Sequence, residues 1–249
     1  MEDAVMKNQY FGDYRDMFKY DLIQEAMKKN KGFKRFSFIP MLTDFKECND
    51  GNKRYYNSEK IEKRPGSGNT DLVGYLRDYN DKVRDRKNRD LRHIRDYFGA
   101  YINIEIFEPD EPMQGKYFVN KNRSLYFQAI PDIYLESALV FVDPDNGIEV
   151  KNSSKKHILY QEIRSLYERM SDDSVLMIYQ HFPRQKHEEY IDRRKEELGQ
   201  RSGSKLKPLW ISDNEIIFFF LSKGQEANNI ISGVLSDYSG KYPEKCRNG

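Results

Sequence analysis

The sequence predicts an α/β protein built on a mainly parallel sheet with one antiparallel edge strand. Residues 138–142 form an apolar, β-branched run that stops abruptly at polar, turn-forming residues, a pattern typical of a strand buried on both faces. Candidate strands alternate with candidate helices along the chain, and such alternation produces parallel pairing through helical crossovers. Two final candidate strands, at 208–213 and 215–221, follow each other almost directly, so we expect them to pair antiparallel.

The individual elements follow from hydrophobic periodicity and from the residues at their ends. Residues 14–29 carry apolar side chains at helical spacing, and Asp13 is placed to cap the start of that helix. Residues 36–42 form the first candidate strand, although Pro40 weakens its second half. The polar stretch 43–70 is expected to be a mobile loop or an insertion. Residues 71–97 are expected to form a helix or a broken pair of helices. The remaining expected helices span 117–130, 157–170, 187–200 and 226–238, and the remaining strands span 102–107, 138–143 and 174–179. This order of elements occurs in the methyltransferase variant of the Rossmann fold, so we expect a Rossmann-like sheet of that type.

Length and composition indicate one folded domain over residues 1–249, with a loose tail at 240–249. Charged residues make up 33% of the chain, but aromatic residues make up 14%, which is far too many for a disordered protein. A net charge of +2 neither requires nor excludes a polyanionic partner. The two cysteines, Cys48 and Cys246, lack metal-type spacing, and free thiols are expected. With no signal peptide and no run of about 20 apolar residues, the sequence favours a cytoplasmic protein without a membrane partner.

The segment that follows the strand at 138–142 is the first candidate site. Asp143, Asp145 and Glu149 fall within seven residues of each other, and ligands of open α/β sheets bind at the carboxyl ends of the strands. Such carboxylates can orient an exocyclic amine, act as a general base, or bind Mg²⁺ through oxygen. A plain turn is the simpler alternative, since Pro, Asp, Asn and Gly are common turn residues.

Two further groups belong to the same predicted cleft. Asp16 and Lys19 lie three residues apart on one helix face, and Gly12 allows close approach of the backbone. A capped helix with a solvated ion pair explains that group equally well. Gln180 and His181 end the strand that follows the first candidate site along the chain, where His181 would face the acids. Arg184, Lys186 and other basic residues then follow.

Basic residues concentrate in two tracts, both interleaved with acids, so that a solvated helix face is the simplest explanation for each. The first tract is Lys82, Arg84, Arg86, Lys87, Arg89, Arg92 and Arg95, and the second is Arg184, Lys186, Arg193, Arg194, Lys195, Arg201, Lys205 and Lys207. The second is the better candidate for contacts with nucleic acid, because its Arg201 to Lys207 end contains no acid. Arg184 is a candidate phosphate contact.

The chain resembles an uncharacterised bacterial family with Gly-Asp-x-x-Asp-x-x-Lys and Asp-Pro-Asp-Asn-Gly motifs. More distantly, it is similar to the adenine-N6 methyltransferases of 23S ribosomal RNA. Gly12, Asp16 and Lys19 match the motif that opens those enzymes, and Asp143 and Pro144 match the Asp-Pro-Pro-Tyr motif that ends their fourth strand.

The resemblance implies S-adenosylmethionine as cofactor and a base amine in DNA or RNA as substrate. Asp143 would accept a hydrogen bond from that amine, with Asp145 and His181 beside it as further catalytic residues. The implied cofactor-binding residues are Gly12, Asp16, Lys19 and Glu108, and the implied substrate-binding residues are Asn146, Gln180 and Arg184. Asn146 stands where those enzymes carry an aromatic, and residues 39–44 lack their glycine-rich loop.

Two alternatives remain open on the residues alone. A metal-dependent nuclease would use Asp143, Asp145 and Glu149 as Mg²⁺ ligands with His181 as base, and the spelling of Pro131-Asp132 with Glu149-Val150-Lys151 matches the short PD-(D/E)xK pattern. A non-catalytic binding module on a degenerate methyltransferase scaffold is the other, because a fold does not fix a function.

Overall fold

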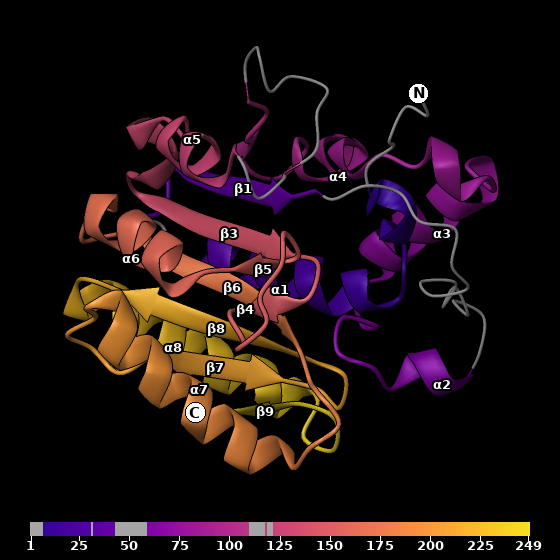
Figure 1. Ribbon diagram of the computed structural model, residues 1–249. Helices are drawn as coiled ribbons and strands as arrows, with labels where there is room; N and C mark the ends of the chain where they lie inside the picture. The colour runs from indigo at the N-terminus through magenta and orange to yellow at the C-terminus, as the bar shows by residue number, and fades with distance from the viewer. Residues whose placement is uncertain (1–6, 31, 43–58, 110–117, 119–121) are drawn as a thin grey trace.

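The computed structural model describes residues 7–30, 32–42, 59–109, 118 and 122–249. Its centre is a seven-stranded sheet in the order β2-β1-β3-β6-β8-β7-β9 (Figure 1). The strands are β1 (Arg35–Met41), β2 (Ile104–Ile106), β3 (Ala138–Pro144), β6 (Val175–His181), β7 (Leu209–Ser212), β8 (Ile216–Ser222) and β9 (Arg247–Asn248). Two short strands, β4 (Gly147–Ile148) and β5 (His157–Ile158), form a separate parallel pair.

The pairing confirms a Rossmann-like, mainly parallel core with antiparallel strands at one end. β2, β1, β3 and β6 run parallel, while β8 is antiparallel to β6 and β7 is antiparallel to β8. The antiparallel strand β8 lies inside the sheet, between β6 and β7, and the short strand β9 completes the edge by pairing antiparallel with β7. The order reverses between β1 and β3, because the chain passes from β1 outward to β2 before it returns to β3.

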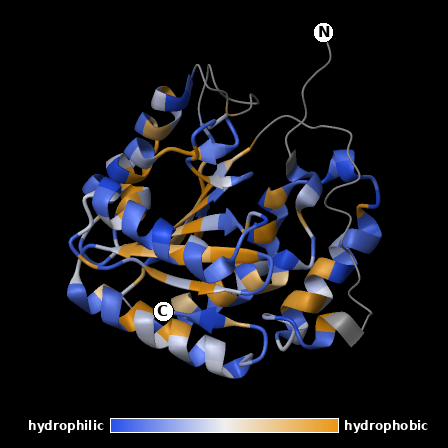
Figure 2. Ribbon diagram, turned by 60° about the horizontal axis from the view of Figure 1, so that its bottom comes forward, coloured by the Kyte–Doolittle hydropathy of each residue, from blue (hydrophilic) through white to orange (hydrophobic). Residues whose placement is uncertain are grey.

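Helices cover both faces of the sheet and bury two hydrophobic cores. One face carries α1 (Arg15–Lys29), α3 (Thr70–Lys82), α4 (Ile94–Phe98) and α8 (Gln225–Lys241). The other carries α5 (Arg123–Gln128), α6 (Tyr160–Arg169) and α7 (His187–Ser202). Alternate residues of each strand enter opposite cores, as Phe141 and Val142 of β3 do, because successive side chains of a strand point to opposite faces. Figure 2 shows the resulting hydrophobic strands between helices with hydrophilic outer surfaces.

Of the helix or broken pair of helices expected over 71–97, the structure has the broken form, α3 and α4 with two short 3₁₀ turns between them. Two other local expectations require correction. Residues 157–158 form β5 instead of the first turn of a helix, and α6 begins at Tyr160. The tail 240–249 is not loose: α8 extends to Lys241, Cys246 is buried, and β9 pairs with β7.

The polar stretch 43–70 is partly outside the described residues, which resume at residue 59. Its described part contains the short helix α2 (Glu59–Glu62), and Ile61 is buried in one of the two cores. The backbone of Gly66 packs against the backbone of Met17 in α1, so closely that a Cβ at Gly66 would overlap it. This part of the predicted mobile loop is therefore packed structure.

Candidate functional site

Three of the candidate residues gather where β3 and β6 end. Asp143 is the penultimate residue of β3, His181 is the last residue of β6, and Lys19 reaches them from α1. In the paired strands, Asp143 lies opposite Pro40 of β1, at the point where the strand order reverses. Open α/β sheets bind ligands at this position, so the predicted location of the site at the carboxyl edge of the sheet has a structural basis.

Lys19 connects the two motifs that the sequence singles out. Its Nζ lies 2.9 Å from Oδ2 of Asp143 and 3.0 Å from Oδ1 of Asp16. Lys19 is buried, and burial by itself lowers the pKa of its ammonium group, but the two carboxylates outweigh that effect and hold the pKa above its ordinary value. Burial raises the pKa of Asp16, and the charge of Lys19 opposes that rise. Lys19 therefore stays protonated at neutral pH and forms an ion pair with each acid.

Aromatic rings form the rest of the environment of the Lys19 ammonium group. Nζ lies 5.5 Å from the ring centre of Tyr20, 5.7 Å from that of Phe141 and 5.2 Å from that of Tyr179. Such ring faces attract a cation, and more strongly when water is excluded. Oδ2 of Asp143 is held by Lys19, while 21% of the Asp143 side chain is exposed. Asp143 is thus the member of the group that a ligand can reach.

Gly12 has a structural reason to be glycine. Its φ is +83°, and a Cβ at this position would lie 2.8 Å from Oδ1 of Asn80. The N–H of Gly12 donates to Asp16 over 2.8 Å, and its carbonyl accepts from Asn80 over 2.7 Å. The close approach that the sequence predicts is therefore an approach to the Asn80 side chain of α3, and it positions Asp16.

His181 is half-buried beside the same group of charges. Its Nε2 lies 2.9 Å from the hydroxyl of Tyr179. Burial, followed by the positive charge of Arg15, lowers the pKa of His181 to about 4, although Asp145 acts in the opposite direction. The imidazole is therefore neutral at physiological pH. Lys19 also contributes to this lowering, which places His181 within electrostatic range of the Lys19–Asp143 pair.

Asp145 points to a different partner from Asp143. Its Oδ2 lies 3.1 Å from Nζ of Lys156, and 11% of its side chain is exposed. The backbone N–H of the neighbouring Asn146 donates to the carbonyl of Lys156 over 2.8 Å, and Asn146 itself is exposed at the turn. A role of Asn146 in substrate binding remains a prediction.

Gln180 supports the backbone beyond β3, and its expected role in substrate binding remains a prediction. It is 4% exposed. Its Oε1 accepts from the N–H of Ile148 over 2.7 Å, and its Nε2 donates to the carbonyl of Asn146 over 3.2 Å. Gly147, between those two residues, has a φ of +100°, and a Cβ there would overlap the Gln180 amide. Gln180 thereby fixes the turn that carries Asp145.

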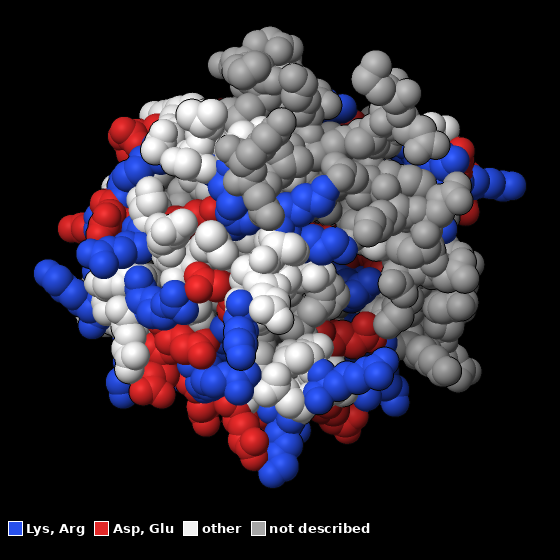
Figure 3. All heavy atoms as spheres, viewed as in Figure 1, with Lys and Arg blue, Asp and Glu red and all other residues white. Residues whose placement is uncertain are grey.

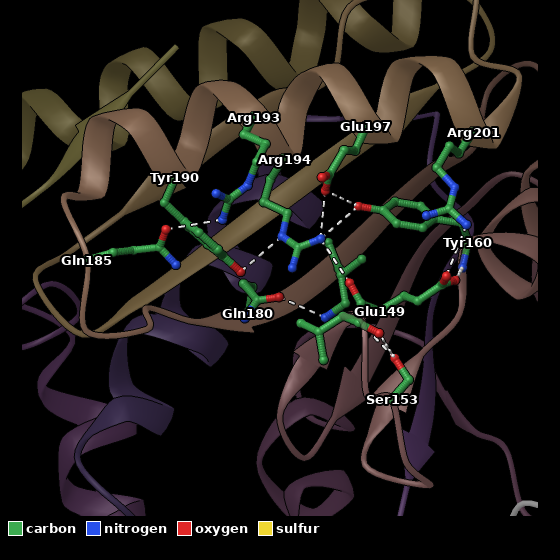
Figure 4. Close-up of polar contacts among 12 residues, drawn as sticks. Glu149, Ser153, Tyr160, Gln180, Gln185, Tyr190, Arg193, Arg194, Glu197 and Arg201 are labelled. Atoms are coloured by element: carbon green, nitrogen blue, oxygen red, sulfur yellow. Dashed lines mark hydrogen bonds and ion pairs between the residues drawn. The ribbon is translucent and has the colours of Figure 1, made fainter.

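Glu149 also has a structural task. Its Oε2 accepts the backbone N–H of Tyr160 at the start of α6 over 2.9 Å, and its Oε1 lies 3.0 Å from Arg201. Figure 4 shows Arg194 reaching from α7 into this group, where it donates to the Glu149 carbonyl over 2.9 Å and to Glu197 over 2.7 Å. These contacts fasten the β4–β5 pair to α6 and α7.

The metal cluster of the nuclease alternative is not formed. Asp143, Asp145 and Glu149 turn to Lys19, Lys156 and the start of α6, respectively. Within the described residues, no group of three or more His, Cys, Asp or Glu side chains is arranged to hold a metal ion. Asp132 precedes β3 and pairs with Arg169, whereas Glu149 follows β3, so the PD-(D/E)xK residues lie toward opposite ends of that strand.

Glu108 and Arg184 lie at the surface. Glu108 follows β2 and pairs with Arg92 over 3.3 Å and Arg95 over 3.0 Å, and 44% of its side chain is exposed. No contact connects it directly to Lys19 or Asp143 within the described residues, so its role on the cofactor side remains a prediction. Arg184 is exposed beyond β6, and its predicted phosphate contact also remains a prediction.

The basic tracts do not form a single positive surface. Arg89 and Arg194 are buried, at 2% and 5% exposure, and Arg201 is paired with Glu149. In the view of Figure 3, Lys and Arg side chains alternate with Asp and Glu side chains across the described surface. A mixed surface of this kind agrees with the solvated helix faces that interleaved charges predict.

Several residues of the site were not predicted from the sequence. Tyr179 contacts both Lys19 and His181, Asn80 positions Gly12, and Arg15 pairs with Asp13 over 2.8 Å beside them. Tyr179 alternates with Gln180 along β6, and this alternation could have placed it on the face of Lys19. No local signal identifies Asn80, which lies 68 residues from Gly12.

The fold and the site define a Rossmann-like α/β protein with a charged group at the carboxyl ends of its central strands. In comparisons with known proteins, no family model, curated protein or solved structure matched the chain. The resemblance to adenine-N6 methyltransferases therefore stays a prediction. Of the helices in the described part, none combines the length and the apolar character needed to cross a membrane.

Proposed function

We propose that this protein transfers a methyl group from S-adenosylmethionine to a base amine in nucleic acid. The observation that carries the proposal is the position of Asp143, at the carboxyl end of β3 and beside the reversal of strand order between β1 and β3. The mainly parallel sheet that ends in the antiparallel strands β8 and β7 agrees with a methyltransferase-type sheet, and it supports the proposal at the level of the fold alone.

The residues present suit such a cofactor in two respects. Glu108, at the end of β2, offers a half-exposed carboxylate that can accept hydrogen bonds from a ribose. Asp143, two strands along the sheet, offers a carboxylate that is charged and partly exposed. The residues that follow β1 from position 43 lie outside the described part. When bound, S-adenosylmethionine would supply the methyl group.

The chain's own groups would orient the amine. Asp143 would accept a hydrogen bond from the N–H of the base and direct the nitrogen lone pair toward the methyl donor. Lys19 would fix the carboxylate of Asp143, because its ammonium group is itself held by Asp16 and the aromatic rings. His181, neutral and adjacent to these charges, would contact the substrate without adding a positive charge.

The proposal is tested by isothermal titration with S-adenosylmethionine and its demethylated product, together with transfer of a radiolabelled methyl group to bulk RNA and DNA. Asp143→Asn preserves the size of the side chain and is expected to reduce methyl transfer at least about 100-fold, the scale of losing one positioned catalytic group. Asp132→Asn, on an exposed residue before β3, is the matched control. The absence of binding by both ligands would refute the proposal.

A binding module without turnover is the second candidate. It is favoured by residues 39–42, the end of β1 and the residue after it, which contain no glycine to let a cofactor approach the backbone closely. Ligand binding in titration with no labelled product from either nucleic acid would support this candidate instead.

A further inference from the structure

A charged hollow lies beside the candidate site on the same edge of the sheet. Its volume is about 280 Å³, and three segments line it: Lys63, Arg64 and Pro65 after α2, Asp213, Asn214 and Glu215 between β7 and β8, and Lys245 near the end of the chain. The carbonyl of Glu215 accepts from the N–H of Phe182 over 3.2 Å, and Ile216 pairs with His181. The hollow is therefore next to the residues that end β6.

The acids of the hollow are already compensated. Oδ1 of Asp213 accepts the N–H groups of Glu215 over 2.7 Å and Ile216 over 2.8 Å. Glu215 accepts hydrogen bonds from the hydroxyl of Tyr14 and, over 2.9 Å, from Arg64. Both carboxylates thus serve the turn and the walls of the hollow, and neither is left with an uncompensated charge.

The cations of the hollow divide into a fixed one and two outward-facing ones. Arg64 is held by Glu215 and lies 3.9 Å above the ring centre of Tyr14. Lys63 and Lys245 are exposed and make no ion pair with any residue in the described ranges. The hollow consequently holds three cations against two carboxylates, and the cations come from two separate parts of the fold.

We infer that this hollow binds a backbone phosphate of a single-stranded nucleic acid whose neighbouring base reaches Asp143. The inference rests on the proposed function for the identity of the base site. A positioned guanidinium group and two mobile ammonium groups are the groups that bind phosphate. The hollow is slightly smaller than the usual range for drug-sized ligands, and a phosphate needs less room. A base must leave its stack to reach a protein cleft, which favours a single strand.

The test is fluorescence anisotropy with a labelled single-stranded RNA of twelve nucleotides and the DNA of the same sequence, over a range of salt concentrations. The variant is Lys63→Glu/Lys245→Glu. The matched control is Lys28→Glu/Lys34→Glu, which changes the net charge equally on exposed residues before β1, at the opposite end of the sheet and outside both basic tracts. We expect the first variant to bind at least about 10-fold more weakly and to lose about 0.7 from the salt slope, the contribution of one phosphate contact to a single strand.

Equal losses in both variants would overturn the inference, because they would show a dependence on net charge alone. The inference would also be overturned if inorganic phosphate displaced the labelled strand at the same concentration as the unlabelled strand does. If charge reversal unfolds the protein, as judged by circular dichroism, Lys63→Gln/Lys245→Gln with Lys28→Gln/Lys34→Gln as control gives the same comparison.

The inference and the proposed function can be refuted independently of each other. Asp143 does not line the hollow, so charge reversal at Lys63 and Lys245 tests the hollow, and Asp143→Asn tests the reaction. Strand binding that depends on Lys63 and Lys245 without methyl transfer supports the hollow and refutes the proposed reaction. Methyl transfer that is unaffected by charge reversal supports the reaction and refutes the hollow.

Discussion

The ammonium group of Lys19 lies 2.9 Å from the carboxylate of Asp143, across 124 residues of sequence. This contact joins the start of α1 to the end of β3, so two motifs that are distant in the chain form one buried charged group. Its third member, Asp16, is fixed in turn by the N–H of Gly12. Because the group is largely buried, removing one of its charges leaves the others uncompensated, which is energetically costly.

Substitution of Lys19 is expected to be strongly destabilising. Lys19→Met removes the cation and leaves Asp16 buried without its ion pair, which should lower the free energy of unfolding by about 3–5 kcal/mol. Urea unfolding followed by circular dichroism measures this loss. Lys34→Met, the same change at an exposed lysine, should stay within about 0.5 kcal/mol of the parent protein; comparable losses in the two variants would contradict the prediction.

His181 is expected to make stability depend on pH. Its pKa is about 4 in the folded protein and about 6.5 in an unfolded chain. Between these values the unfolded state binds more protons, so the free energy of unfolding rises with pH through this window and falls as pH drops from 6.5 to 4. His181 contributes at most about 1.4 kcal/mol per pH unit there.

Urea unfolding at pH 7, 6 and 5 tests that contribution. His181→Gln should flatten the dependence relative to the parent protein. His93→Gln, at a side chain that is 51% exposed, controls for loss of an imidazole as such. An unchanged slope in His181→Gln would show that another group is responsible.

Gly147 is expected to be intolerant of even the smallest side chain. Gly147→Ala forces a left-handed conformation on alanine and places its Cβ against Gln180, which together should cost about 2–4 kcal/mol. Gly74→Ala is the matched control, since a Cβ at that position in α3 meets no atom within 4 Å, and it should increase stability by about 0.5–1 kcal/mol. Thermal unfolding of the two variants should therefore shift in opposite directions.

Substitutions of the adjacent residues Arg194 and Arg193 are expected to change the free energy of unfolding by very different amounts. Arg194→Met removes the donor to the Glu149 carbonyl and to Glu197 and should lower the free energy of unfolding by about 2–4 kcal/mol. Arg193 is exposed, and Arg193→Met should change it by no more than about 0.5 kcal/mol. Denaturant titration of both variants decides the matter, and similar midpoints would exclude a structural role for Arg194.

Hydrophobic patterning by itself determined most of the fold. The run at 138–142 and the alternation of strands and helices predicted the parallel core, because each strand of such a sheet must be apolar on both faces. The elements that were missed are short: β4, β5 and β9 contain two residues each, too few to show a period. The buried position of Cys246 in the supposedly loose tail likewise depends on pairing with β7, which no local signal reveals.

For the candidate site, too, the sequence predicted some features and the tertiary structure decided the others. The sequence alone identified Asp16, Lys19, Asp143 and His181, because charged residues that follow apolar strands or line one helix face are visible in one dimension. Only the tertiary structure decided that Lys19 neutralises Asp143, that Gln180 and Glu149 support the backbone, and that Asp145 turns to Lys156. The physical reason is that spacing along a chain fixes which residues share an element, whereas the partner of a buried charge depends on which elements pack together.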